Sequence, residues 1–318
     1  MKFFTEIPIQ YHSDNPIDYQ SKMLLLGSCF VENIGNKFDY FKFKTLQNPF
    51  GVLFQPKAIE QFITHALEGK VYTESDLFKQ QDVWHCYDAH SKLSGLDQES
   101  VLNGLNSALA ITKTYLETAS HIVITLGTAW VYRHLDSEVL VANCHKVPQK
   151  AFNKELLSPQ AIFNALQHIE RLITSVNPNA TIIFTVSPIR HTKDGFQENT
   201  RSKSHLITAI HQVLDRSETN TLFYFPSYEI MMDELRDYRF YATDLIHPNE
   251  TAIEYIWEKF KTAWLAPSTL PIMKDVHVIQ SGLQHKPFNE TSEAHQKFLK
   301  TLQAKIIALQ ERVEGLSF

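Results

Sequence analysis

The chain alternates between short apolar runs and longer amphipathic segments, which is the pattern of strands followed by helices. The runs of strand length are 22–27, 41–46, 121–126, 181–186 and 221–225. Most are apolar throughout, whereas 41–46 alternates Phe with Lys, as expected of a half-exposed strand. Apolar strands that alternate with helices indicate a mostly parallel sheet covered on both faces. We therefore expect a three-layer α/β/α fold with a mostly parallel, five-stranded sheet.

Apolar residues at helical spacing predict helices between these strands. The predicted helices cover 29–40, 56–65, 99–118, 159–175, a segment ending near 214, 249–262 and 291–313. The very polar stretch 191–203 contains a glycine and is predicted to be a loop, and 130–142 is predicted to be a hairpin.

The same pattern divides the chain into a main domain and an extension. Residues 1–265 are expected to form the α/β domain, with an aperiodic insertion at about 66–98. Residues 266–318 are expected to form a C-terminal helical extension, whose helix packs either on the body or on a second subunit.

Composition narrows the class of protein. The chain has 318 residues, of which 43% are apolar and 20% charged, as in ordinary globular proteins. A net charge of −5 argues against nucleic-acid and anionic-membrane partners, and three cysteines argue against a disulfide framework. The first residues lack the apolar core of a signal peptide, and no apolar run approaches the roughly 20 residues that span a bilayer. These features predict a cytoplasmic protein.

The first candidate site is the turn after the first predicted strand. Gly27 ends the strand, and Ser28 and Cys29 follow at the start of a predicted helix. Open α/β sheets bind ligands at the carboxyl ends of their strands, and a helix N-terminus favours a thiolate or an oxyanion. The alternative is structural: Ser28 caps the helix and Cys29 is a small buried residue.

The second candidate site is an Asp-x-x-His-Pro sequence before the last helix of the body. Pro248 suits the first turn of that helix and forces His247 into an extended conformation. At this spacing the carboxylate of Asp244 can bind the imidazole Nδ1–H, which leaves Nε2 free to act as a base. The alternative is a turn carboxylate beside a surface histidine.

Along this alternating α/β chain the candidate nucleophile comes first, then the aspartate and then the histidine. In this order the chain resembles the SGNH, or GDSL-type, hydrolase superfamily, whose fold is flavodoxin-like. The chain is more similar still to the GSCFA family, named for a block that here reads Gly27-Ser28-Cys29-Phe30-Val31. Further similar blocks are NPFG at 48–51, LGTAWVY at 126–132, ANCHK at 142–146, VSPIRH at 186–191 and DYRFYATDLIHPN at 237–249.

The resemblance implies a Cys-His-Asp or Ser-His-Asp site. Aligning Gly27 with the glycine of the superfamily places Cys29 at the nucleophile position, whereas a shift by one residue places Ser28 there. We favour Cys29, and we expect His247 and the helix N-terminus to hold the pKa of its thiol well below about 8.5.

The resemblance also implies oxyanion donors: the amide of the nucleophile, a glycine matched by Gly51, and an asparagine. Ala129 occupies the place of that asparagine. The substitute donors we consider are Asn48, Thr128 and Asn143. Turn formation is an equal explanation for Asn48, and loop capping for Asn143.

Other polar residues are candidates for substrate binding. Arg190 and His191 come first after strand 181–186 and could bind an anionic or sugar substrate, although a solvated loop explains them equally well. His145 could line the same crevice from the base of the hairpin. The spacings of His85, Cys86, His90, Cys144 and His145 match no standard zinc pattern, so we expect no metal and no cofactor.

Two functions follow as expectations. The first is an SGNH-like hydrolase or acyltransferase that acts on a small-molecule or carbohydrate ester or thioester, with an O-acylated glycan or sugar as the candidate substrate. The second is a catalytically silent module that binds a glycan or small molecule on the same scaffold, which the missing asparagine favours.

Overall fold

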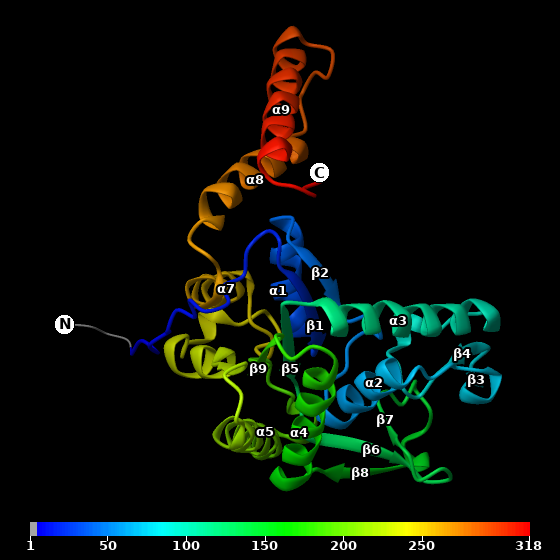
Figure 1. The fold of residues 1–318 in the computed structure, drawn as a ribbon. Helices are drawn as coiled ribbons and strands as arrows, with labels where there is room; N and C mark the ends of the chain where they lie inside the picture. The colour runs from blue at the N-terminus through cyan, green and yellow to red at the C-terminus, as the bar shows by residue number, and fades with distance from the viewer. Residues whose placement is uncertain (1–4) are drawn as a thin grey trace.

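The computed structural model describes residues 5–318 and has a five-stranded parallel sheet at its centre (Figure 1). The strand order is β10-β9-β5-β1-β2, and every neighbouring pair is parallel. The strands are β1 (Lys22–Gly27), β2 (Lys44–Gln47), β5 (His121–Leu126), β9 (Thr181–Val186) and β10 (Leu222–Phe225). The three-layer α/β/α fold expected from the sequence is confirmed.

Helices cover both faces of this sheet. Alternation along β1 sends Leu24 and Leu26 into one core and Met23 and Leu25 into the other. The first core packs against α2 (Pro56–Glu68), α3 (Gln98–Thr118), α4 (Pro159–Val176) and α5 (Phe196–Arg216). The second packs against α1 (Cys29–Tyr40) and α7 (Glu250–Trp264). Strands buried on both faces explain why their sequences are apolar runs.

The strand order reverses direction at the centre of the sheet. From β1 the chain passes to β2 on one side, and the later strands β5, β9 and β10 are added on the other side. In open α/β sheets such a reversal opens a crevice at the carboxyl ends of the two strands concerned. Here that place is the end of β1, at Gly27, beside the end of β5, at Leu126.

Two small antiparallel sheets lie outside the central sheet. The insertion contains the hairpin of β3 (Phe78–Gln80) and β4 (Val83–His85). The predicted hairpin at 130–142 is confirmed as β6 (Trp130–His134) and β7 (Leu140–Val141). It gains a third strand, β8 (Phe152–Leu156), which the sequence did not predict.

The loop predicted at 191–203 is wrong for most of its length, because α5 already begins at Phe196. The polar residues Asn199, Ser202 and Lys203 are buried at helical spacing. The first turns of α5 therefore bury a polar face at the edge of the sheet, and an apolar periodicity search misses them. The strand predicted at 41–46 is β2, which starts later because α1 continues to Tyr40.

The C-terminal extension is a hairpin of α8 (Thr269–Gln284) and α9 (Glu293–Arg312) that projects from the body (Figure 1). Leu302, Ile306 and Leu309 join the same apolar core as α8. The side chain of Gln280 donates a hydrogen bond to the carbonyl of Tyr40 at 3.0 Å, which ties the hairpin to the end of α1. A short helix, α6 (Ser227–Glu229), follows β10. Among the described helices none is long and apolar enough to cross a membrane.

The backbone at Gly27 allows no side chain. Its φ is +130°, and an added methyl group would lie 2.1 Å from the carbonyl oxygen of Thr125. We expect Gly27→Ala to lower the free energy of unfolding by about 3 kcal/mol or more, measured by urea denaturation. Gly69→Ala is the matched control, because Gly69 also has a positive φ, +72°, but no atom within 4 Å of the added methyl. It should cost about 1 kcal/mol, and equal losses would contradict the close-approach argument.

Candidate active site

The turn at Gly27–Cys29 is held rigidly at the carboxyl end of β1. The backbone N–H of Gly27 donates to Asn48 Oδ1 at 2.9 Å, and the N–H of Ser28 donates to the carbonyl of Thr125 at 3.0 Å. Cys29 is the first residue of α1. The predicted strand, turn and helix are confirmed here, with the bounds that the sequence indicated.

Ser28 occupies the N-cap position of α1 but does not act as a side-chain cap. Its Oγ is fully buried and has no hydrogen-bond partner within residues 5–318. A buried hydroxyl without a partner costs roughly 1–3 kcal/mol, so its usual place in a protein is beside bound water or a ligand. The explanation of Ser28 as a helix cap is therefore wrong for its side chain, which bonds to no backbone N–H of α1.

Cys29 is partly exposed at the N-terminus of α1. Burial raises the pKa of its thiol and outweighs the backbone N–H groups of Cys29 and Phe30, which lower it. Glu32 also raises this pKa, and the ammonium of Lys203 lowers it. The expectation of a thiol pKa below its ordinary value is thus wrong, because desolvation is the largest effect.

Asp244 and His247 form the pair that their spacing predicted. His247 Nδ1 lies 2.6 Å from Asp244 Oδ2, and both side chains are about half exposed. Asp244 Oδ1 accepts the backbone N–H groups of Ile246 and His247 at 2.9 and 3.0 Å. These backbone bonds, followed by the bond from the imidazole, lower the pKa of Asp244 to about 2. The carboxylate thus orients the ring and directs Nε2 away from itself.

Arg190 and His191 connect the turn to the Asp244–His247 pair. The backbone N–H of Arg190 donates to the carbonyl of Ile246 at 3.4 Å. A methyl group added at Gly127, after β5, would lie 3.3 Å from both Ser28 Cβ and His191 Nε2. The candidate residues from both ends of the chain therefore lie at one edge of the sheet. Within residues 5–318 no hydrogen bond joins His247 to Ser28 or Cys29.

The guanidinium of Arg190 lies over the ring of Tyr241, 4.5 Å from its centroid. His191 is nearly enclosed, and burial lowers the pKa of its imidazole to about 3, with smaller contributions from Lys203 and His247. His191 is therefore neutral at ordinary pH, and its buried Nε2 has no partner in the described residues.

The four candidate oxyanion donors differ in whether they are free. The amide of Gly51 donates to the carbonyl of Asn48 at 2.7 Å. Thr128 Oγ1 bonds to Ser202 Oγ at 3.0 Å. Asn143 lies against the insertion, because its backbone N–H donates to the carbonyl of Tyr87 and its Oδ1 accepts the amide of His145 at 2.9 Å. Asn48 uses Oδ1 to hold Gly27, whereas its Nδ2 is buried with no partner in the described chain. Of the four, Asn48 retains an unused donor beside the turn.

His145 lies in a separate cluster that packs the insertion against the body. Its Nδ1 bonds to Ser91 Oγ at 3.1 Å and its Nε2 to the carbonyl of Cys86 at 2.7 Å. The ring lies 4.6 Å from that of His85, and burial lowers the pKa of His145 to about 4. Both ring nitrogens are thus used, and His145 has none left for a ligand. Residues 5–318 contain no group of three or more His, Cys, Asp or Glu able to hold a metal ion.

The sequence placed Lys203 in the polar stretch predicted to be a loop and favoured Arg190 and His191 over it, so its buried position was not predicted. Its side chain is enclosed, and Nζ donates to the carbonyls of Gly127 and Ser187, both at 2.8 Å. These carbonyls follow the ends of β5 and β9. Burial lowers the pKa of Lys203 to about 7. The helical spacing of Asn199, Ser202 and Lys203 was the available signal, because it indicates one polar helix face.

Unpartnered polar groups gather at this edge of the sheet. Residues 51–55 cross the ends of the central strands, since Leu53 N–H donates to Gly27 and Phe54 accepts from the amide of Gly127. The buried side-chain atoms here that lack a partner in the described chain are Ser28 Oγ, Asn48 Nδ2, both amide atoms of Gln55, and His191 Nε2. Such a concentration is typical of a site completed by water or a ligand.

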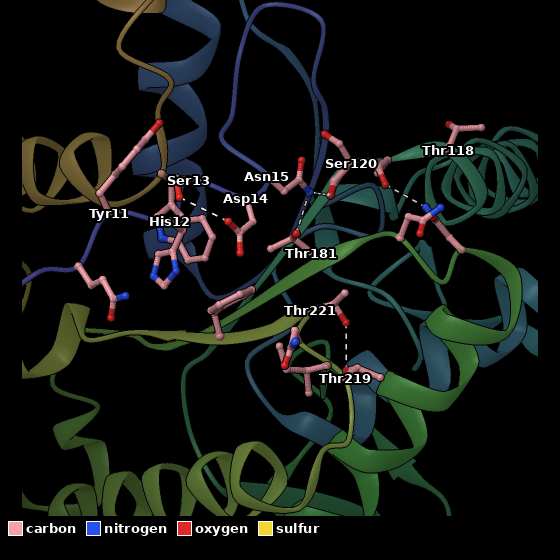
Figure 2. Close-up of a pocket in the computed structure, with 18 residues that line it drawn as sticks. Tyr11, His12, Ser13, Asp14, Asn15, Thr118, Ser120, Thr181, Thr219 and Thr221 are labelled. Carbon is pink, nitrogen blue, oxygen red and sulfur yellow. Dashed lines mark hydrogen bonds between the residues drawn. The ribbon is translucent and has the colours of Figure 1, made fainter.

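A cavity of about 960 Å³ lies at the opposite, amino-terminal edge of the sheet (Figure 2). Figure 2 shows hydroxyl and amide side chains from the strand starts and helix ends around it. Several of them hold the fold together, for example Asn15 Nδ2, which bonds to Thr181 Oγ1 at 2.8 Å. None of the site residues expected from the sequence lines this cavity.

Comparison with known proteins yields two family matches. The sequence model of the GSCFA family matches residues 22–260. A second sequence model, described as the C-terminal domain of GSCFA domain proteins, matches residues 276–318. Curated proteins give no match. Among solved structures, an acetyl xylan esterase (Est2A) from the rumen bacterium Butyrivibrio proteoclasticus is similar at 9% identity and a TM-score of 0.38. The match covers 77% of this chain and 63% of the esterase.

The depressed pKa of Asp244 can be tested directly by a carboxyl-carbon NMR titration. We expect a midpoint near pH 2 in the wild type, because the folded state binds this proton weakly. The contribution of Asp244 to stability is therefore present above its ordinary pKa and is lost as the pH falls toward 2. In His247→Ala the side-chain bond is gone and the midpoint should rise, although the backbone bonds remain. An unchanged midpoint in that variant would contradict the pairing.

Proposed function

The chain belongs to the GSCFA family, and from the geometry of its site we propose that it is a hydrolase or acyltransferase that acts on an ester or thioester. The observation that supports this most directly is the 2.6 Å bond between Asp244 and His247 at the same sheet edge as the Gly27–Cys29 turn. A carboxylate that orients an imidazole near a nucleophile at a helix N-terminus is the arrangement that covalent acyl transfer requires.

In the proposed reaction Cys29 is the nucleophile. His247 Nε2 takes the thiol proton while the sulfur attacks the acyl carbon, and it then gives that proton to the leaving alcohol or thiol. Water or an acceptor hydroxyl next attacks the thioester, with His247 again as the base, and this step releases the acyl group and restores the thiol. The Asp244 carboxylate stabilises the imidazolium that forms in each step.

The oxyanion needs donors at the turn. The backbone amide of Cys29 at the helix N-terminus and the unused Nδ2 of Asn48 are the donors we propose. The amide of Gly51 becomes available only if its bond to the Asn48 carbonyl is broken. In this proposal Asn48 replaces the asparagine donor of the superfamily, whose place in this chain is occupied by Ala129.

For the substrate we propose an O-acylated sugar or glycan. Arg190 lies at the crevice with its guanidinium on Tyr241, and the buried polar groups of Ser28, Gln55 and His191 lack partners in the described chain. Hydroxyl groups of a sugar can donate to and accept from such groups.

A catalytically silent binding module is the second candidate. The bonded amide of Gly51 and the raised thiol pKa of Cys29 both favour it, because each weakens acyl-transfer chemistry. This candidate keeps the ligand site but assigns Cys29 no chemical step. Ligand binding would then survive Cys29→Ala, and turnover would be absent.

The proposed mechanism is tested by covalent labelling with a thiol-directed acyl probe and a serine-directed fluorophosphonate. We expect the acyl probe to label Cys29, labelling to disappear in Cys29→Ala, and its rate to fall by about 100-fold or more in His247→Ala, since general-base catalysis typically contributes 10²–10⁴-fold. Ser28→Ala should retain labelling. Loss in Ser28→Ala with retention in Cys29→Ala would assign Ser28 as the nucleophile instead.

Cys144→Ala is the matched control, because Cys144 is also a partly exposed free cysteine, whose pKa burial raises to about 11. It should not alter labelling of the site. Labelling that persists in Cys29→Ala, Ser28→Ala and His247→Ala alike would refute the mechanism. Binding of acylated sugars without turnover, unchanged in Cys29→Ala, would support the silent module.

A further inference from the structure

Lys203 is an enclosed cation whose charge the proposed acyl-transfer steps do not use. Its side chain lies on the buried face of α5, only 1% exposed, and Nζ donates to the carbonyls of Gly127 and Ser187. Within residues 5–318 no carboxylate forms an ion pair with it. An enclosed ammonium without a carboxylate partner is costly, so a residue kept only to join two strand ends would be better uncharged.

The position of this ammonium relates it to the Gly27–Cys29 turn. Gly127, whose carbonyl binds Nζ, packs so closely against the turn that an added methyl would lie 3.3 Å from Ser28 Cβ. Ser28 directly precedes Cys29, and the N–H of Ser28 donates to the carbonyl of Thr125 on β5, the strand that leads into Gly127. The ammonium is therefore anchored to the backbone against which the nucleophile turn rests.

We propose that Lys203 is a positioning residue for Cys29: it fixes the ends of β5 and β9 behind the turn and, while it carries its proton, favours the thiolate form of Cys29. This inference rests on the proposed role of Cys29 as the nucleophile. The proton lost by the thiol goes to His247 Nε2 or to water, and Lys203 keeps its own.

The two groups influence each other in both directions. Burial lowers the pKa of Lys203 to about 7, and the thiolate of Cys29 raises it, while the ammonium lowers the pKa of Cys29. By linkage these two effects are equal in free energy. Lys203 therefore supports the thiolate near pH 7 and below, and this support fades at higher pH as the lysine becomes neutral.

The other groups around the pair do not produce the same pH dependence. Glu32 on α1 raises the pKa of Cys29 and so opposes the thiolate. His191 stays neutral because its pKa is lowered to about 3. The ring of Tyr228 on α6 lies 5.6 Å from Nζ and stabilises the ammonium. His247 lies close enough to lower the pKa of His191, and its effect can be removed by substitution.

The test follows iodoacetamide alkylation of Cys29 in the full chain from pH 6 to pH 10, with the Cys29 peptide quantified by mass spectrometry. In Lys203→Met we expect alkylation at pH 6, where wild-type Lys203 carries its proton, to be about tenfold slower than in the wild type, the effect of one pKa unit on the thiolate fraction. Above about pH 9 the two rates should converge, because wild-type Lys203 is then neutral. Cys144 in the same samples is the internal control, and its rate should not change.

Further variants separate charge from structure. Lys203→Arg keeps a charge at every pH, so it should retain the wild-type rate at pH 6 and exceed it at pH 9. Tyr228→Leu, a milder change that serves if Lys203→Met does not fold, should slow alkylation at pH 7 by a smaller factor. The comparison is repeated in His247→Ala, so that titration of the imidazole does not contribute.

An equal change at every pH, or no change in Lys203→Met and Tyr228→Leu, would overturn the electrostatic role of Lys203. The readout needs no acyl substrate. A protein that shows the Lys203-dependent profile but never forms an acyl-enzyme would refute the proposed reaction and leave this inference intact.

Discussion

The close approach of β1 to β5 at Gly27 is the constraint on which the rest of the site depends. A side chain at Gly27 would overlap the carbonyl of Thr125, so glycine alone lets the strands meet and the chain turn directly into α1. This turn lies where the strand order reverses, at the carboxyl ends of β1 and β5. The same packing brings Gly127 against Ser28 and so places the polar face of α5 behind the turn.

Burial at this edge of the sheet shifts the pKa of acidic and basic groups in opposite directions. It raises the pKa of Cys29, lowers that of Lys203 to about 7, and lowers that of His191 to about 3. Each shift disfavours a charge, as expected where water is excluded. Asp244 is the exception, because it is exposed and held by backbone N–H groups, and its charge is favoured. The negative charge of Asp244 thus lies at the solvent side of the site.

The sequence was sufficient for the central fold because β1, β5 and β9 are apolar on both faces. The bounds predicted for β1, β5 and β9 agree with the structure, and the spacing in Asp-x-x-His predicted the bond between Asp244 and His247. The sequence was insufficient where a helix buries polar residues, as α5 does with Lys203. It was also insufficient where hydrogen bonding depends on contacts with residues distant in the chain. The occupied amide of Gly51, the buried ring of His145 and the raised pKa of Cys29 are set by such contacts.

These contacts bear on how a thiol with a raised pKa could become reactive. Burial is the largest effect on Cys29, and unpaired polar atoms of Ser28, Asn48 and His191 remain beside it in the described chain. A substrate that bonded to these atoms would remove a penalty of roughly 1–3 kcal/mol for each, and that free energy could offset the cost of charging the sulfur. On this argument burial keeps the proposed nucleophile protonated, and in the proposed reaction the substrate would supply the free energy that activates it.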